Sequence, residues 1–302
     1  MPKITSLVAL SLTAFLALTA LASNAANAVE VETKEPIKLM YTNTSDSDFI
    51  SYVFGEILED VGYNVEYVNI DYFAHFAAVE TGDLHLSTGA WDSTGWTTLN
   101  DLTSRGKVEN YGSTGVEIQE GWWYPAYIKE ACPELPSWTA LKSEKCAASF
   151  ATAETAPAGR FVDAPSDWGT GARELAESLG LNIEVISAGS AVALIATIKT
   201  SVEAGEPVIG YGYTPHWFID SVDGGFIDFE QDYAGTGYVW KMGNKELMSQ
   251  VPIASRLLHL YTLPTSAVAS AMDRIDNDGE SIKAVAREWV EKNRSTWQAW
   301  LR

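Results

Sequence analysis

Cysteine and histidine are scarce in this chain of 302 residues. The sequence contains two cysteines and four histidines, and the histidines show no pairing at metal-ligand spacing. Two thiols cannot form the multi-cysteine sites that hold structural zinc or an iron–sulfur cluster. We therefore expect no metal and no cofactor.

Basic residues are also few. Lys and Arg number 20 against 40 Asp and Glu, which gives a formal net charge of -20 at pH 7. A surface this acidic repels phosphate backbones and anionic membranes, so no nucleic-acid partner is expected. It suits a protein that binds cationic or zwitterionic small molecules.

Catalytic motifs are missing as well. The sequence has no Gly-x-Ser-x-Gly elbow, no Walker loop and no dinucleotide fingerprint. The acidic run 276–280 faintly resembles a calcium loop, but Arg274 and Val285 occupy the first and twelfth ligand positions. We interpret the run as a polar turn, and nothing in the sequence indicates catalysis.

Only one long apolar run is present, and it stands near the start. Residues 7–22 carry no charge and lead into a small-x-small pattern at Ala26 and Ala28. This arrangement is typical of a secretory signal peptide over residues 1–28, with Val29 as the first mature residue. We therefore predict export to the periplasm.

Export to an oxidising compartment would allow the two cysteines to form a disulfide. Cys132 and Cys146 lie 14 positions apart, and an even cysteine count in an oxidising compartment favours one disulfide. The alternative is a pair of buried free thiols.

Aromatic and apolar residues, by contrast, are plentiful. The chain is 46% hydrophobic and contains 11 Trp and 13 Tyr. This content excludes intrinsic disorder as the main state. Aromatic rings are also the main means by which proteins hold methylated cations.

Strand patterns alternate with amphipathic helix patterns, which predicts an α/β fold. The pattern occurs twice: residues 62–68 match residues 180–186 in character, and residues 79–83 match residues 202–206. The strand predicted after residues 79–83 ends at Trp91, and the strand predicted after residues 202–206 ends at Tyr213. We interpret the repeat as two related α/β lobes.

Open α/β sheets bind ligands beyond the carboxyl ends of their strands. By that rule four segments should face one cleft: 42–47, Trp91, 165–171 and 213–217. Three of them present aromatic rings, and the other offers backbone amides near a helix N-terminus. Such a cleft suits a zwitterion, because ring faces attract its cation and amides attract its anion.

From residue 35 to residue 302 the chain resembles the glycine betaine/proline betaine-binding proteins of ABC importers. The motifs that carry the resemblance are Gly121–Tyr127 (GWWYPAY), Gly159–Phe161 (GRF), Pro165–Gly169 (PSDWG), Tyr211–Trp217 (YGYTPHW) and the tryptophans of the last 14 residues, Trp289, Trp297 and Trp300. The resemblance implies a two-lobed periplasmic-binding-protein fold of type II with its ligand cleft between the lobes. We expect residues 29–118 plus 238–302 in lobe 1 and residues 119–237 in lobe 2.

The resemblance also implies site residues. Trp91 and Trp168 match two tryptophans of the family's aromatic box, and Gly169 follows the second. Tyr213 stands where the family usually has a third Trp, so the box here has a weaker cation–π face and an extra hydroxyl. His216 matches a position that contacts the ligand carboxylate in some relatives.

Further candidates are less definite. Trp122 and Trp123 are adjacent, so at most one of them can reach the cleft from a strand, and Trp123 is retained. Glu120 is either a carboxylate beside the box or a solvated loop residue. Trp217 is a weaker candidate beyond the Thr-Pro turn.

These observations predict a periplasmic substrate-binding protein of an ABC importer, monomeric, which closes on a methylated onium osmolyte and docks on a membrane permease. Glycine betaine, trimethylamine N-oxide, choline and dimethylsulfoniopropionate all fit the motifs. The alternatives are a binding protein that feeds a chemoreceptor and a periplasmic lyase or demethylase acting on the same ligands.

Overall fold

A computed structural model describes residues 30–230, 233 and 235–302. The predicted signal peptide lies outside these described residues. No helix within them is long and apolar enough to cross a membrane.

The strands form a single mixed sheet. Their bounds are β1 (Ile37–Tyr41), β2 (Val65–Asn69), β3 (Leu86–Trp91), β4 (Val108–Pro125), β5 (Gly159–Asp163), β6 (Ile183–Ser187), β7 (Ile209–Thr214), β8 (Gly224–Phe226) and β9 (Gly235–Asn244). The order is β2-β1-β3-β9-β4-β7-β5-β6, and β8 pairs with β4 outside this path. Within each half the neighbours β2-β1-β3 and β7-β5-β6 run parallel, whereas β4 and β9 are antiparallel to their partners.

Helices connect and cover these strands. Their bounds are α1 (Ser45–Val61), α2 (Ala74–Thr81), α3 (Asp92–Ser104), α4 (Glu144–Ser149), α5 (Ala172–Leu179), α6 (Ala191–Ala204), α7 (Trp217–Ser221), α8 (Lys245–Ser249), α9 (Pro252–Leu260), α10 (Thr265–Asp276), α11 (Ile282–Lys292) and α12 (Arg294–Ala299). Short 3-10 turns occupy Ala126–Glu130, Trp138–Lys142 and Ser166–Trp168.

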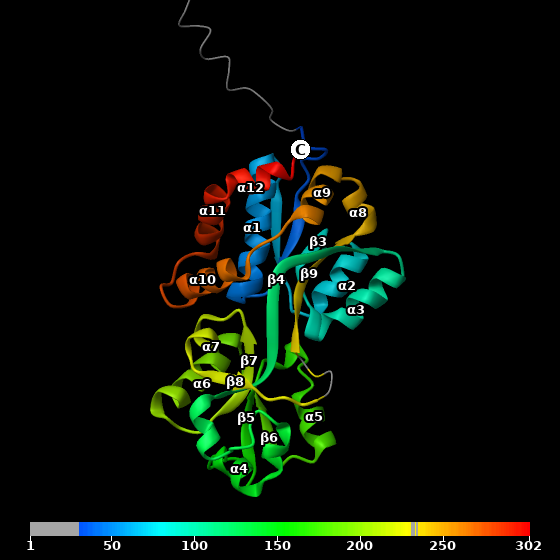
Figure 1. Ribbon diagram of the computed structural model, residues 1–302. Helices are drawn as coiled ribbons and strands as arrows, with labels where there is room; N and C mark the ends of the chain where they lie inside the picture. Colours follow the sequence, from blue (N-terminus) through cyan, green and yellow to red (C-terminus); the bar gives the residue numbers. More distant parts are fainter. Residues whose placement is uncertain (1–29, 231–232, 234) are drawn as a thin grey trace, which may run out of the picture.

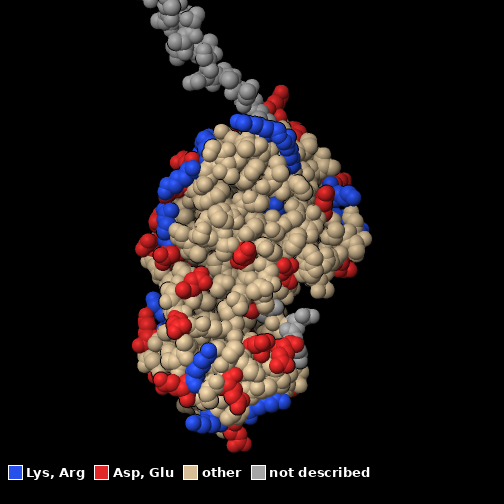
Figure 2. Space-filling model, in the orientation of Figure 1, with Lys and Arg blue, Asp and Glu red and all other residues tan. Residues whose placement is uncertain are grey.

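The elements gather into two lobes (Figure 1). The first lobe contains β1–β3, α1–α3 and α8–α12, and the second contains β5–β8 and α4–α7. The long strand β4 runs from one to the other, paired with β9 on the way. Figure 2 shows a waist between the lobes with Asp and Glu side chains on both sides of it. The α/β, two-lobed prediction is confirmed.

The repeat seen in the sequence corresponds to one structural unit used twice. Gly62 ends α1 at a φ of 114° and Gly180 ends α5 at a φ of 63°, each in the left-handed conformation that glycine adopts without strain. Their N–H groups bond carbonyls of the preceding helical turn, and the chain then enters β2 or β6. The glycine of each repeat therefore sets the angle at which a helix returns to its parallel strand.

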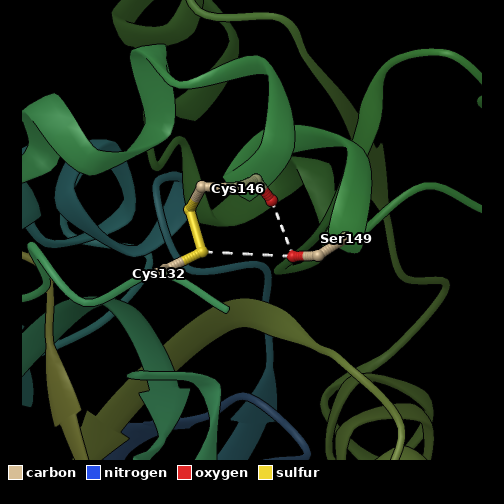
Figure 3. The surroundings of a disulfide bond; sticks show 3 residues. All are labelled: Cys132, Cys146 and Ser149. Atoms are coloured by element: carbon tan, nitrogen blue, oxygen red, sulfur yellow. Dashed lines mark hydrogen bonds between the residues drawn. A yellow bond between two sulfur atoms is a disulfide. The ribbon is translucent and has the colours of Figure 1, made fainter. Parts of the chain in front are cut away.

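A disulfide joins Cys132 to Cys146, as predicted. Figure 3 shows it beside Ser149, whose hydroxyl donates a hydrogen bond to the carbonyl oxygen of Cys146 at 2.6 Å. The bond fastens the segment after Ala126–Glu130 to α4, in the second lobe.

Replacing both Cys132 and Cys146 by Ala should lower the free energy of unfolding by about 3 kcal/mol, because the unfolded chain then loses a loop constraint of this size. Urea unfolding followed by circular dichroism measures the change. Excess reductant should bring the wild type to the stability of the variant and leave the variant unchanged. Equal stabilities of oxidised wild type and variant would contradict this expectation.

Candidate functional site

A cavity lies where the two lobes meet. It holds about 500 Å³ of empty space, part of it open to solvent. Residues of both lobes line it. They are Thr42, Thr44, Asp46, Ser47, Tyr72, Trp91, Thr94, Glu120, Asp167, Trp168, Tyr211 and Tyr213. All four segments that the strand-end rule selected contribute to this lining. The cavity therefore forms where parallel strands of both lobes end, as expected for an open α/β sheet.

Four aromatic rings form a corner of the cavity, with Tyr213 at its centre. The ring centroid of Tyr213 lies 5.8 Å from that of Trp91 and 5.6 Å from that of Trp168, and both contacts are edge-to-face. Tyr211, two positions earlier on the same strand, lies 6.5 Å from Tyr213 and 6.1 Å from Trp168. The contacts of Tyr213 with Trp91 and Trp168 are nearly perpendicular, so these rings do not stack and part of their faces stays available to a cation.

The corner is assembled from both lobes. Trp91 is the last residue of β3, and its N–H donates to the Tyr72 hydroxyl oxygen at 3.1 Å. The Thr94 hydroxyl donates to the same oxygen at 3.0 Å, so the ring of Tyr72 is fixed. Trp168 ends a 3-10 turn after β5, and Tyr213 lies on β7. The first lobe thus supplies one Trp, and the second supplies the other Trp and the tyrosine between them.

Glu120 reaches the cavity from β4, where it pairs with Tyr213 in the β4–β7 ladder. The Tyr211 hydroxyl donates to Glu120 Oε1, whereas Oε2 is buried and has no hydrogen-bond partner among the described residues. Burial raises the pKa of Glu120 to about 7, against the lowering effect of the Tyr211 hydrogen bond. Near neutral pH this group is therefore present in both its neutral and its charged form.

A second buried carboxyl group, Asp46, lines the cavity from the first turn of α1. Its Oδ1 likewise has no partner among the described residues, and burial raises its pKa. Among the described residues that line the cavity there is no Lys or Arg. The polar part of the site can therefore donate hydroxyl and carboxyl hydrogens or attract a cation, but it offers no positive side chain to an anion.

Four of the sequence-predicted residues lie outside this lining. His216 is buried behind Tyr213, with ring centroids 5.0 Å apart, and its Nδ1 accepts the Phe218 N–H at the start of α7. Burial lowers the pKa of His216 to about 4, so the ring is neutral at pH 7. Trp123 is buried among Gly212, Gly224 and Phe218 of the second lobe.

Trp217, the third of them, borders a second cavity of about 760 Å³ that lies beyond Tyr213. Tyr213 and Thr44 line both cavities. Gly169 is absent from the cavity lining, and it lies where the lobes touch. It has a φ of 60°, and a Cβ built on it would lie 2.6 Å from Cε2 of Phe73 in the first lobe. Any side chain at this position would have to displace the Phe73 ring, and the positive φ also favours glycine.

Sequence reasoning missed Tyr72, Tyr211 and the individual role of Asp46. Tyr72 follows β2, so the strand-end rule that selected Trp91 would have found it had it been applied to every strand. Tyr211 shares a face of β7 with Tyr213 because side chains alternate along a strand. Asp46 lies inside a predicted segment, but its burial could not be read from the sequence.

The family described as the substrate binding domain of the ABC-type glycine betaine transport system matches residues 35–292. The chain belongs to this family. It is a substrate-binding protein of ABC-type transport and not an enzyme, and the rival interpretations, a lyase or demethylase and a chemoreceptor-feeding protein, find no support in these relationships.

Relatives of known name agree with this placement. A trimethylamine N-oxide-binding protein of Pelagibacter ubique (strain HTCC1062) is 30% identical over 285 residues, which cover 88% of this chain and 90% of the relative. Lactococcal OpuAC, closed around glycine betaine, has a TM-score of 0.73 at 15% identity and covers 88% of this chain and 99% of its own. A choline-binding protein in complex with choline has a TM-score of 0.77 at 16% identity, covering 90% and 93%. At these identities the two solved structures establish the fold.

The raised pKa of Glu120 makes the stability of the ligand-free protein depend on pH. The folded state keeps the proton up to about pH 7, whereas the unfolded chain releases it near pH 4.5. Stability should therefore fall as pH rises through this window, by about 3 kcal/mol at most, at about 1.4 kcal/mol per pKa unit. Glu120→Gln keeps the acceptor for Tyr211 and does not titrate, so its stability relative to wild type should grow between pH 5 and pH 8.

Urea unfolding at unit pH steps measures this difference. Glu117→Gln is the matched control, because Glu117 lies on the same strand with its side chain exposed, and it should follow the wild type at every pH. A constant difference between Glu120→Gln and wild type from pH 5 to pH 8 would show that the carboxyl group does not titrate in this window.

Proposed function

We propose that this substrate-binding protein captures a methylated onium compound without a carboxylate group, and that trimethylamine N-oxide fits the site best. The observation that carries the proposal is the junction of the aromatic corner with two buried carboxyl groups, Asp46 and Glu120, and no basic side chain in the lining. One end of such a cavity suits methyl groups with a positive charge, and the other suits a hydrogen-bond acceptor or a cation.

The aromatic corner would hold the methylated cation. Trp91 and Trp168 each contact Tyr213, all three line the cavity, and each desolvated ring face that meets the cation would contribute about 2 kcal/mol of attraction. Both Trp91 and Tyr213 are buried where the lobes meet, so water would compete little with the ligand. The box is therefore shared between the lobes, and closing the lobes completes it.

The polar end would select the ligand's second group. Neutral Glu120 can donate its Oε2 hydrogen to the N-oxide oxygen, and the Tyr72 hydroxyl, which accepts two hydrogen bonds, keeps its own hydrogen to donate. The carboxylate of glycine betaine would carry a full negative charge into this lining without an Arg or Lys to balance it, and ionisation of Asp46 or Glu120 would repel it. The name of the Pelagibacter ubique relative supports the same choice.

The cellular setting is part of the proposal. We propose that residues 1–28 direct export to the periplasm, that residues 29–118 plus 238–302 and residues 119–237 are the two moving lobes, and that the protein acts as a monomer. The closed, loaded form would dock on an ABC permease in the inner membrane. Support comes from the family, from the disulfide and from β4 and β9, which link the lobes as a two-stranded hinge.

Trp91→Ala and Trp168→Ala should each weaken binding of trimethylamine N-oxide by about 2 kcal/mol, roughly thirtyfold, because each removes one cation–π face. Isothermal titration calorimetry measures the dissociation constants. Trp96→Ala is the matched control: Trp96 lies on α3 near Trp91, is 37% exposed and is absent from the cavity lining. If either box variant binds as tightly as this control, that ring does not face the ligand.

Glu120 should make binding depend on pH in opposite directions for two probes. Trimethylamine N-oxide should bind less tightly as pH rises from 6 to 8.5, because ionised Glu120 repels its oxygen; choline, a permanent cation, should bind more tightly. Glu120→Gln retains a donor without titrating, so it should abolish both trends. Wild-type affinities for both probes that are flat across this range would contradict this assignment.

A further inference from the structure

One carboxylate oxygen connects the two lobes at the edge of the second cavity. Oδ2 of Asp276, the last residue of α10, accepts a hydrogen bond from the Ser45 hydroxyl at 3.0 Å and another from Nε1 of Trp217 at 3.0 Å. Ser45 and Asp276 belong to the first lobe, whereas Trp217 begins α7 of the second. Figure 1 shows α10 and α7 facing each other across the boundary.

Both donors are next to walls of the ligand cavity. Ser45 begins α1 and directly precedes Asp46 and Ser47, which line the cavity. Trp217 directly follows His216, whose ring contacts Tyr213 at the centre of the aromatic corner. The carboxylate of Asp276 is therefore linked to the first-lobe wall of the cavity through Ser45 and to the second-lobe wall through Trp217.

The second lobe holds the indole of Trp217 in place for this bond. Lys199 Nζ, on α6, lies 5.4 Å from the ring centroid of Trp217, and the ring of Phe218 lies 5.8 Å away. Moving the lobes apart separates Nε1 from Asp276 but leaves Lys199 and Phe218 with Trp217. The Asp276 bond is thus specific to the closed arrangement.

We propose that Asp276 is a positioning residue that latches the closed cleft, holding Trp217 and Ser45 together while the ligand is bound. The latch rests on the proposed function in that it acts on the lifetime of a bound solute. A bond that exists only when the lobes are closed stabilises the complex after encounter. It therefore slows ligand release and leaves the rate of entry nearly unchanged.

The test uses stopped-flow tryptophan fluorescence with trimethylamine N-oxide and choline as probes. Trp217→Phe removes the N–H donor, leaves a smaller ring and keeps an aromatic group beside Lys199. Asp276→Ala removes the acceptor, and Asp276→Asn is the matched control that keeps one carbonyl oxygen to accept. Trp217→Phe and Asp276→Ala should each raise the dissociation rate about tenfold, the range for a hydrogen bond to a charged group, with association within about twofold of wild type. Asp276→Asn, whose neutral carbonyl oxygen can still accept, should raise the dissociation rate less than Asp276→Ala.

The double variant separates a latch from unrelated structural effects. If the two residues act through one bond, Trp217→Phe combined with Asp276→Ala should release the ligand no faster than the faster single variant. Multiplying effects, or single variants that release both probes at the wild-type rate, would overturn the proposal. Circular dichroism checks that each variant is folded, and Ser45→Ala should give a smaller increase because it leaves the bond between the lobes intact.

Small-angle X-ray scattering of the ligand-free proteins keeps this test independent of the ligand. Trp217→Phe and Asp276→Ala should have a larger mean radius of gyration than wild type, because the closed arrangement loses a bond that the open one lacks. If the wild type binds neither probe, the proposed function fails and scattering alone decides the latch. Identical curves for wild type and both variants would then overturn it.

Discussion

Two carboxyl groups buried beside aromatic rings, without a basic partner, constrain this site more than any other feature. An ionised carboxylate removed from water without a counter-charge is costly, and the protein meets that cost partly by keeping Glu120 protonated near neutral pH. Glu120 Oε2 and Asp46 Oδ1 have no hydrogen-bond partner among the described residues. They therefore favour a ligand with a positive charge or with a hydrogen-bond acceptor. Ring faces beside the same carboxyls favour a cation that water solvates poorly.

The architecture explains why such a site exists only between lobes. Glu120 lies on β4, which is paired at its start with the first-lobe end of β9 and farther along with β7 of the second lobe. Trp91 reaches the cavity from the first lobe, and Trp168 and Tyr213 reach it from the second. Under the proposed function neither lobe alone would surround the cation, so affinity and closure would be one equilibrium. The Asp276 bond to Trp217 adds to the same equilibrium from outside the cavity.

The fold and much of the cavity lining could be predicted from the sequence, because both follow from the periodicity of strands and helices. Trp91, Trp168 and Tyr213 stand at strand ends or in the turn after a strand, and that position can be read from the alternation of strands and helices. The roles of His216, Trp123 and Trp217 could not be read in this way. His216 and Trp217 follow Tyr213 closely, but the chain turns into α7 there and carries them behind the ring. Trp123 points into the second lobe because β4 continues beyond the cavity, and no local pattern shows where a long strand leaves a cleft.

Gly169 shows how a residue that is absent from the cavity lining can govern the site. Its missing side chain is the space that the ring of Phe73 occupies when the lobes meet. A side chain at this position would have to displace the ring of Phe73, which is 39% exposed, before the lobes could meet as closely. Relatives that differ here would then differ in how long they retain a solute while recognising the same one. Under the proposed function, the residues that contact the ligand and the residue that limits contact between the lobes stand at different positions of the chain, so natural variation could change one property without the other.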